Sequence, residues 1–447
     1  MMRPYVDPVE GDATLPREVD IAIVGGGIIG CCAALWAAEQ GHRVALIEKG
    51  RIAGEQSGRN WGWVRRMGRA AAEYPLGIES LRLWDGFKTR LDLDTGFRRT
   101  GIVYTARTDR ELAWLDAIER DARTFRIGTR RLSDAQLADY FPGAKLRARG
   151  AVCTDDDGRA EPALAAPAIA QAARAAGAHV LTRCAVRGIE TAAGRVSAVL
   201  TERGRIGCAS VILAGGAWSR LFAGNLGLDL PQLRVRSSVL RTQPVPGGPR
   251  HAIGNGEFGL RPRLDGGYTI ARRGRSAVQI TPDAFRLMPR FLSGLREARG
   301  EIALTLDDSL WAGFVTPRRW ADDDVTPFER CRVLDPDPQQ RPLRQAMRAV
   351  EAAFPAFAGA RIAERWGGII DVTPDGVPII DHAPGLPGLV VATGFSGHGF
   401  GIGPGAGQLA AELASGASPL VDPSSFRLDR FSRPSTGGRR QAREATA

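Results

Sequence analysis

The chain has 447 residues and 44% hydrophobic content, which is more than a single hydrophobic core usually supports, so we expect about two domains. No apolar run approaches the ~20 residues that cross a bilayer, and the first 18 residues carry acids and prolines where a secretion signal has an apolar core. We therefore expect a cytoplasmic protein without a membrane span.

The net charge of +11 would suit a nucleic-acid partner. Only three of the 60 basic residues are lysines, however, and the arginines are spread along the chain beside 49 acids without a basic stripe interleaved with aromatics. We interpret the excess as compositional bias that can attract anionic substrates, and we expect no nucleic-acid partner. The six cysteines lack Cys-x-x-Cys or Cys/His ligand spacing, so we expect neither a metal site nor a disulfide framework.

Residues 19–50 contain an apolar strand, a glycine-rich turn, a helix and a second strand. Gly25 allows the tight turn, Gly27 lets the backbone approach a pyrophosphate, and Gly30 lets the helix pack closely on the sheet. Glu48 ends the second strand, where its carboxylate can accept hydrogen bonds from a ribose hydroxyl. The pattern predicts a dinucleotide whose phosphates face the helix N-terminus.

Further along the chain, helical spacing and strand-like alternation predict a second layer of elements. Short strands between 233 and 280, with a turn at 265–267, indicate a separate antiparallel sheet. Helices are predicted over 74–90, 109–122, 132–140, 161–176, 344–354 and 408–414, and strands over 179–184, 196–201, 206–213, 259–264, 268–273 and 389–392.

Four segments together resemble the family of FAD-dependent D-amino-acid oxidases and dehydrogenases, glycine oxidases and sarcosine oxidases. They are residues 19–50, residues 159–162 with the strands leading to 214–219, DVTPDGVPI at 371–379, and ATGFSGHGF at 392–400. The last segment is similar to the sarcosine oxidase signature, in which a glycine-rich turn lies over the flavin. The resemblance covers residue 19 to about residue 431.

The resemblance implies an α/β fold, with a Rossmann-type FAD-binding domain and a second domain built on an antiparallel sheet. The FAD-binding domain is expected to be discontinuous, and the two chain ends, which lack periodicity, are expected to be loose tails. The expected boundaries are 18–97, 150–233 and 361–431 for the FAD-binding domain, 98–149 and 234–360 for the substrate domain, and 1–17 and 432–447 for the tails.

The resemblance also implies FAD as the cofactor. A helix N-terminus at 399–403 would stabilise the negative charge of a reduced flavin, whereas the alternative is a plain glycine-rich loop before a C-terminal helix. Sarcosine oxidases attach the flavin through a cysteine shortly before the T-x-D segment, but residues 366–371 contain none, so we expect non-covalent FAD. The expected cofactor-binding residues are Gly25, Gly27, Ile28, Ile29, Gly30, Glu48, Lys49, Ser57, Gly58, Arg59, Asn60, Val186, Ala214, Gly215, Trp218, Gly368, Gly397, His398, Gly399, Phe400 and Gly401.

The chain departs from the family where the substrate carboxylate binds. Sarcosine oxidases have a lysine directly after S-G-H-G-F and another over the flavin, but this chain has Gly401 at the first place and no lysine after Lys145. Glycine oxidases have an arginine just before the T-x-D segment, where this chain has Ile370. Arg65 lies in a stretch that resembles the one whose arginine binds the carboxylate in sarcosine oxidases, and a guanidinium matches a carboxylate bidentately. The alternative is a solvated surface arginine.

Four residues are expected to be catalytic. Arg65 would hold the substrate acid, and Tyr268 and Arg272 lie on the hairpin that the family places over the flavin face. His398 is expected to orient the flavin rather than act as a base, and a core or helix-capping histidine is the alternative.

The predicted reaction removes a hydride from the carbon that bears an amine, passes it to flavin N5 and leaves an imine that water hydrolyses. The expected substrate is a D-amino acid or an N-substituted amino acid, and the expected electron acceptor is a quinone, a dye or O2. Two alternative substrates use the same fold, namely a secondary amine without an α-carboxylate and a 2-hydroxy acid. A more distant alternative, suggested only by the basic composition, is a flavin-containing RNA-modifying or interaction protein.

Overall fold

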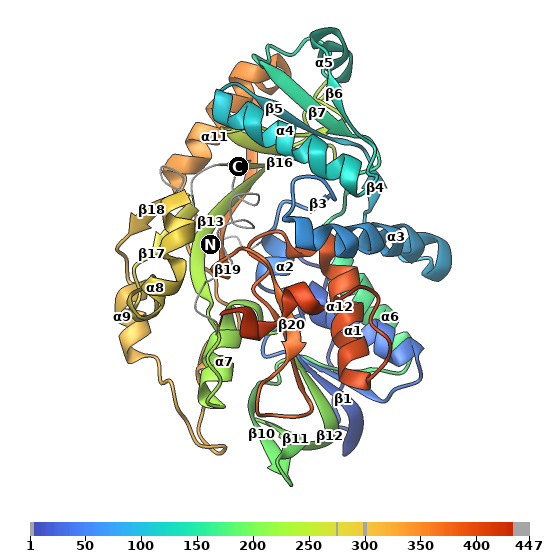
Figure 1. Cartoon of the computed structure of the whole chain (residues 1–447), viewed down its shortest axis with the longest axis vertical. Coiled ribbons are helices and arrows are strands. Elements are labelled where there is room, and N and C mark those ends of the chain that lie inside the picture. The colour runs from blue at the N-terminus through green and yellow to red at the C-terminus, as the bar shows by residue number, and fades with distance from the viewer. Residues whose placement is uncertain (1–3, 274–275, 298–301, 432–447) are drawn as a thin grey trace.

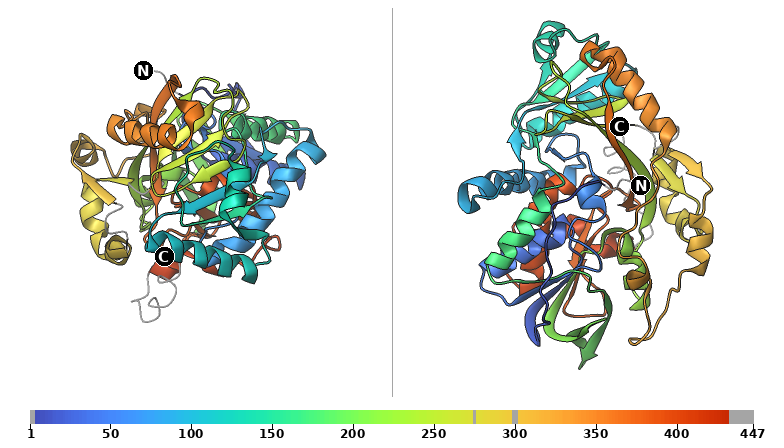
Figure 2. Two further views of the ribbon diagram at one scale, coloured as in Figure 1. Left: turned by 90° about the horizontal axis from the view of Figure 1, so that it is seen from above. Right: turned by 180° about the vertical axis from the view of Figure 1, so that it is seen from behind.

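The computed structural model describes residues 4–273, 276–297 and 302–431. Figure 1 shows a lower lobe that contains β1 and an upper lobe built on a larger sheet, and both are visible from behind in Figure 2. Within the described residues, no helix combines the length and the apolar character that a membrane span requires.

The lower lobe contains an eight-stranded sheet in the order β10-β11-β12-β1-β2-β9, with β21 beside β12 and β20 beside β21. β1 pairs in parallel with β2 and β12, as the strand-turn-helix pattern predicted. Helix α1 packs against both α6 and α12. The elements of this lobe are β1 (Glu18–Val24), α1 (Ile28–Glu39), β2 (Val44–Ile47), α6 (Ala165–Ala175), β9 (His179–Leu181), β10 (Val186–Ala192), β11 (Arg195–Thr201), β12 (Gly204–Leu213), α7 (Ser219–Asn225), β20 (Ile379–His382), β21 (Leu389–Thr393) and α12 (Gly399–Ser415).

Glycines allow α1 to lie unusually close to its neighbours. A Cβ on Gly30 would lie 2.0 Å from the carbonyl oxygen of Gly25, and a Cβ on Gly407 would lie 2.6 Å from Cβ of Cys32. The first glycine brings α1 onto the turn after β1, and the second brings α12 onto α1. As a result, the glycine-rich segments near residues 25 and 397 meet at one edge of the sheet.

The upper lobe contains a ten-stranded sheet in the order β18-β17-β13-β16-β15-β14-β5-β7-β6, with β19 paired along β13. Most neighbours are antiparallel, as predicted, but β5–β14 and β17–β18 are parallel. β3, β8 and β4 form a small separate sheet. The remaining elements are α2 (Gln56–Arg59), β3 (Trp63–Val64), α3 (Tyr74–Leu91), β4 (Arg98–Arg99), β5 (Ile102–Ala106), α4 (Asp109–Thr124), β6 (Thr129–Leu132), α5 (Asp134–Tyr140), β7 (Gly150–Thr154), β8 (Gly158–Arg159), β13 (Leu233–Thr242), β14 (Ala252–Gly254), β15 (Phe258–Pro262), β16 (Tyr268–Arg272), β17 (Ser276–Gln279), α8 (Pro282–Glu297), β18 (Ile302–Thr305), α9 (Ser309–Val315), α10 (Pro327–Arg330), α11 (Gln340–Ala353) and β19 (Ile362–Val372).

The structure differs from the predicted elements mainly where packing overrides local propensity. α12 begins at Gly399, where the resemblance implied a helix N-terminus and nine residues before the start that the local pattern predicted, although its first turns are rich in glycine and contain Pro404. α6 begins at Ala165, four residues later than predicted. Ser133 caps α5, because its hydroxyl accepts a hydrogen bond from the Gln136 N–H at 3.2 Å.

The structure differs from the expected domain boundaries and from the expected N-terminal tail. β7 and β19 pair within the ten-stranded sheet, although their residues were assigned to the FAD-binding segments. Residues 4–17 are not a loose tail, because Val6 is buried and the Asp12 carboxylate accepts a hydrogen bond from the Val180 N–H at 2.8 Å. The other expected tail, 432–447, lies outside the described residues.

Candidate active site

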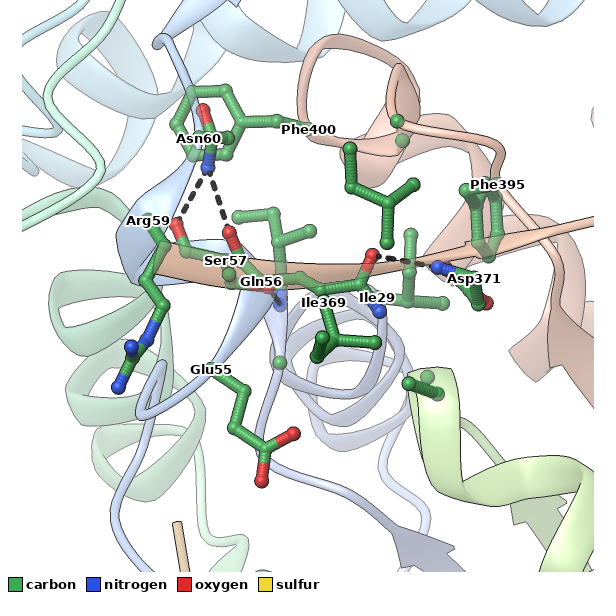
Figure 3. Close-up of a pocket in the computed structure, with 18 of the residues that line it drawn as sticks. Ile29, Glu55, Gln56, Ser57, Arg59, Asn60, Ile369, Asp371, Phe395 and Phe400 are labelled. Carbon is green, nitrogen blue, oxygen red and sulfur yellow. Dashed lines mark hydrogen bonds between the residues drawn. The ribbon is translucent and has the colours of Figure 1, made fainter. Parts of the chain in front are cut away.

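A cavity of about 450 Å³ extends from the carboxyl edge of β1 to the ten-stranded sheet. Its wall includes the turn between β1 and α1, helix α2, strand β19 and the first turn of α12 (Figure 3). Open α/β sheets bind ligands at the carboxyl ends of their parallel strands. Segments far apart in the sequence thus meet at a ligand-binding edge.

Most of the predicted cofactor residues lie on the cavity wall. Gly30 and Gly58 lie behind it, and Gly58 sits where a Cβ would come within 2.4 Å of the Ala53 carbonyl oxygen. Both glycines therefore serve close packing. The predicted residues that line the cavity are Gly25, Gly27, Ile28, Ile29, Glu48, Lys49, Ser57, Arg59, Asn60, Val186, Ala214, Gly215, Trp218, Gly368, Gly397, His398, Gly399, Phe400 and Gly401.

The glycine-rich part of the cavity is formed by residues 25–29, 48–49 and 214–218. Gly25 has a φ of 115°, which only glycine adopts readily, so the chain can turn sharply after β1. The Glu48 carboxylate accepts hydrogen bonds from the N–H groups of Gly26 and Gly50, both at 2.7 Å. Burial raises the pKa of Glu48. The first N–H of α1, that of Ile28, donates to the Ser57 hydroxyl at 2.9 Å.

The Lys49 ammonium contacts Glu55 and Trp218. Its Nζ lies 2.8 Å from Oε1 of Glu55 and 4.5 Å from the centre of the Trp218 ring. The indole N–H of Trp218 also donates to the Glu55 carboxylate at 3.0 Å. This ammonium is therefore held by the cavity wall.

Helix α2 is tied to β19 across the middle of the cavity (Figure 3). The Gln56 side-chain oxygen accepts a hydrogen bond from the Asp371 N–H at 3.4 Å, and the Asn60 amide donates to the Ser57 carbonyl at 2.7 Å. The Asp371 carboxylate is itself buried and accepts from the Gly394 N–H at 2.7 Å and from the Gln232 amide at 2.9 Å. These bonds fix the turn that leads into α12.

The arginine-rich part of the cavity contains Arg65, Arg69, Arg272 and Arg273. Arg65 is half-buried, and its Nη1 donates to the carbonyl of Gly68 at 2.7 Å and to that of Met67. Arg272 donates from Nη1 to the Glu257 carbonyl at 2.8 Å, while its buried Nε has no hydrogen-bond partner among the described residues. A carboxylate binds arginine bidentately along the edge formed by Nε and Nη2. In Arg272 the Nε atom of this edge has no partner among the described residues.

Aromatic rings form the wall beside these arginines. Trp61 and Trp63 lie edge to face with ring centres 5.4 Å apart, and Trp63 contacts Tyr104 at 5.7 Å. The guanidinium of Arg273 lies over Tyr104 at 4.4 Å. This part of the cavity therefore offers both apolar surface and positive charge.

A buried charged cluster lies at the start of α12. Nδ1 of His398 is 3.1 Å from Oε1 of Glu73, and Nη1 of Arg69 is 3.6 Å from the same oxygen. Burial raises the pKa of Glu73, but His398 and Arg69 outweigh it and the pKa is lowered overall. Burial also lowers the pKa of Arg69 to about 10. Arg69 donates to the His398 carbonyl as well, at 3.3 Å.

Arg69 explains the glycine at position 401. A Cβ there would lie 3.1 Å from Nη2 of Arg69, 3.0 Å from the Trp63 carbonyl oxygen and 3.2 Å from Cα of Val64. The place where sarcosine oxidases have a lysine is thus occupied by an arginine from another segment. The spacing of Arg69 and Glu73, four residues apart, was the one sequence pattern that could have revealed this cluster.

Tyr268 is not brought to the cavity. Its ring is buried against Phe357 at 4.8 Å, and its hydroxyl donates to the Pro249 carbonyl at 3.0 Å. Tyr268 and Arg272 are four residues apart and so fall on the same face of β16, but only Arg272, at the other end of the strand, lines the cavity.

Metal ligands and reactive thiols are not gathered at the cavity. The described residues contain no group of three or more histidine, cysteine or acidic side chains that could hold a metal. The six cysteines form no disulfide with one another, five of them are buried, and no cysteine lines the cavity among the described residues.

Comparison with known proteins agrees with this arrangement. The family model DAO, described as FAD dependent oxidoreductase, matches residues 20–413, and the chain belongs to this family. It is 27% identical over 431 residues to the sarcosine oxidase subunit beta of Rhizobium meliloti strain 1021, covering 93% of this chain and 88% of that protein. It is 26% identical over 423 residues to the glycine oxidase of Pseudomonas aeruginosa, covering 91% of this chain and 97% of that protein.

Among solved structures, the L-amino acid deaminase from Proteus myxofaciens in complex with anthranilate superimposes with a TM-score of 0.92. The two chains are 34% identical, and the match covers 96% of this chain and 97% of that chain. The expected fold, the FAD-binding family and the oxidoreductase class are therefore confirmed.

The residues present fit FAD. The cradle after β1 leaves space at Gly27, where a Cβ would meet only the Ser57 hydroxyl, and Glu48 is placed for a ribose. α12 begins without a side-chain cap, and residues 399–401 of its first turn line the cavity, where a helix N-terminus favours negative charge. When bound, FAD would accept a hydride from the substrate carbon.

Proposed function

We propose that this protein oxidises the Cα–N bond of an α-amino acid and that water then hydrolyses the resulting imine. The observation that carries the proposal is a single cavity whose glycine-rich part suits a dinucleotide and whose arginine-rich part suits a carboxylate beside apolar surface. The likeness to an L-amino acid deaminase makes L-amino acids the first substrates to test, ahead of the D- and N-substituted amino acids that the sequence suggested.

The carboxylate partner in this proposal is an arginine of the cavity wall. Arg65 was the candidate from the sequence, but its Nη1 is already engaged with two carbonyl groups. Arg272 has a buried Nε without a partner among the described residues, so a substrate acid would satisfy a donor that is otherwise costly to bury. We assign Arg272 the bidentate contact and Arg65 a supporting charge.

The aromatic wall supports a large apolar or aromatic side chain on the substrate. Trp61, Trp63 and Tyr104 can contact such a group while excluding water from the reacting carbon. With the acid held by Arg272, the substrate would have its amine-bearing carbon fixed in one orientation, which is the main requirement of hydride transfer.

The electron acceptor is proposed to be a quinone or a dye-like molecule rather than O2. Superoxide and peroxide are anions, and a cation beside the flavin stabilises them as charge develops. The one lysine that lines the described cavity, Lys49, is paired with Glu55. We therefore expect slow oxidation of the reduced enzyme by air and fast oxidation by an artificial quinone. Rapid peroxide formation under air would show that an arginine supplies the missing charge.

The deciding experiment is anaerobic mixing of the yellow holoenzyme with matched substrates. The panel contains L- and D-amino acids, N-methyl amino acids, amines without a carboxylate and 2-hydroxy acids. We expect loss of the flavin's visible absorbance with large apolar L-amino acids and release of ammonia with the matching 2-oxo acid. Bleaching by amines alone, or by hydroxy acids alone, would replace this proposal with the corresponding alternative.

FAD is proposed to be held without a covalent bond, supported by the absence of cysteine from the described cavity wall. Acid precipitation should release intact FAD into the supernatant. A cytoplasmic location is also proposed, supported by six cysteines that form no disulfide, because thiols stay reduced in that compartment. Cell fractionation tests it, and recovery of the protein outside the cytoplasmic fraction would contradict it.

A further inference from the structure

Oxidation of an amino acid requires that its ammonium group first loses a proton, because the nitrogen lone pair must be free when the hydride leaves. His398 is the one histidine on the described cavity wall, and its side chain is 24% exposed. Its Nδ1 faces Glu73, whose side chain is only 1% exposed. The ring therefore has one buried nitrogen and one nitrogen on its opposite side.

The tautomer of His398 follows from this contact. Oε1 of Glu73 only accepts hydrogen bonds and lies 3.1 Å from Nδ1, whereas Nη1 of Arg69 only donates and lies 3.4 Å from the same nitrogen. We assign the hydrogen to Nδ1 because the buried carboxylate is the nearer neighbour, and Nη1 of Arg69 also donates to the His398 carbonyl at 3.3 Å. Nε2 is then left with a lone pair that can take up a proton.

The other acids on the described cavity wall already have donors. Glu48 accepts from two backbone N–H groups, and Glu55 is paired with Lys49 and with the Trp218 indole. Asp371 accepts from several buried donors. These three carboxylates are therefore already engaged by neighbouring donors on the cavity wall.

Charge around the cavity favours transfer in this direction. Arg65 and Arg272 on the cavity wall destabilise a substrate ammonium. The charged groups in contact with His398 are Arg69, from the segment after β3, and Glu73, from the turn before α3, and Arg65 acts on Glu73. Arg69 and Glu73 therefore place opposite charges beside the ring, and Glu73 offsets the arginine.

We propose that His398 accepts the proton that the substrate ammonium loses, directly or through one water, and that Glu73 is the positioning residue that makes this possible. The N–H bond of the ammonium breaks, its electron pair stays on nitrogen, and a new N–H bond forms at Nε2. After turnover the imidazolium returns this proton to solvent. The inference rests on the proposed function, since it concerns the same substrate.

Chemical rescue tests the role of His398. Positioned general bases contribute about 100- to 10,000-fold, and we expect His398→Ala to lower kcat/KM by an amount in this range. Added imidazole should restore activity in a concentration-dependent way, because it can fill the space of the lost ring. A variant that keeps its FAD but gains nothing from imidazole would overturn the proposal.

The pH profile tests Glu73. In Glu73→Gln the offsetting charge is lost, so we expect kcat/KM at neutral pH to fall about 10-fold or more and to keep rising with pH toward the pKa of the substrate amine. Glu412→Gln is the matched control, because Glu412 is a buried carboxylate at the other end of α12. Its pH profile should match that of the wild type. A wild-type profile in Glu73→Gln would contradict the assigned role.

NMR of histidine-labelled holoenzyme separates this inference from the proposed function. The chain has five histidines, so the His398 resonance can be assigned by its loss in His398→Ala. We expect the Nδ1–H tautomer in the wild type, and we expect Glu73→Gln to take up the ring proton at a lower pH. If the tautomer and the effect of Glu73→Gln are as expected but no amino acid bleaches the flavin, the proposed function fails while the assigned contact between His398 and Glu73 stands. If the tautomer is Nε2–H, the inference fails whatever the substrate is.

Discussion

The two parts of the cavity are built from different materials. The glycine-rich part positions backbone N–H groups, one carboxylate and the ends of helices around space, as at Gly27 and Glu48. The arginine-rich part is made of long side chains, such as Arg272 and Trp61, that come from different segments. A backbone cradle requires specific residues at fixed spacing, whereas a side-chain wall can be assembled in many ways. The first kind of site therefore defines the family, and the second defines the substrate.

The largest effect should come from the arginine-rich part. Arg272→Ala removes one partner of a substrate carboxylate in a largely buried site, so we expect kcat/KM for amino acids to fall by about 2–4 kcal/mol, or about 30- to 1000-fold. Matched amines without the acid should be nearly unaffected. Arg272→Lys should recover only part of the loss, since a point charge cannot form a bidentate contact.

Arg65→Ala is the informative counterpart. If Arg65 only adds positive charge, kcat/KM for amino acids should fall less in Arg65→Ala than in Arg272→Ala. A larger and acid-selective loss in Arg65→Ala would return the carboxylate to the residue that the sequence favoured. Equal losses on acids and amines in both variants would mean that neither arginine binds the carboxylate.

Substitutions in the glycine-rich part should weaken the binding of FAD and leave the choice of substrate unchanged. Glu48→Ala removes the carboxylate placed for the ribose, and we expect FAD to bind more weakly by about 1.5–3 kcal/mol. Titration of the apoprotein with FAD measures this loss, and the ratio of kcat/KM between substrates should not change. Glu39→Ala, at the far end of α1 and paired with Arg90, is the control that should keep full affinity. Equal affinity in Glu48→Ala would remove Glu48 from the site.

Most of the glycine-rich part was predictable because its physics is local. The strand, the turn with Gly25 and the acid at Glu48 lie within one short stretch, and each requires a particular residue type. The arginine-rich part was only partly predictable. Arg65 and Arg272 could be named, but in a chain with so many arginines nothing in the sequence shows which guanidinium is buried with an unpaired nitrogen.

Other errors have the same cause, since they concern contacts between distant segments. Tyr268 and Arg272 lie on one strand, and only the sheet's packing decides which of them faces the cavity. The local pattern alone placed the start of α12 at residue 408, whereas the helix begins in a stretch of glycines and Pro404, as the resemblance implied, because it packs on α1. The strand pairing of β19 with β13 likewise joins residues more than a hundred positions apart.

A substitution at position 401 tests whether the lysine that sarcosine oxidases have there can be introduced into this chain. A lysine there would need a Cβ within 3.0–3.2 Å of three atoms, two of which belong to the backbone of β3. We expect Gly401→Lys, and already Gly401→Ala, to lower stability by about 1–3 kcal/mol, the usual cost of overpacking. Thermal unfolding measures the loss. Gly401→Lys with wild-type stability and faster reaction with O2 would show that Arg69 moves aside and that the family's lysine can be restored.

The smallest effect should concern the substrate's side chain. Trp61 is half-buried, contacts Trp63 edge to face and lines the cavity. Trp61→Leu opens space without removing charge, so kcat/KM for the largest apolar amino acid should fall relative to that for a small one by about 10-fold, near the lower limit of what a changed apolar contact discriminates. FAD affinity should stay at the wild-type value, because the glycine-rich part is untouched. A fall in FAD affinity with an unchanged ratio between substrates would mean that Trp61 belongs to the flavin's surroundings, and the line between the two parts of the cavity would then run through the aromatic wall.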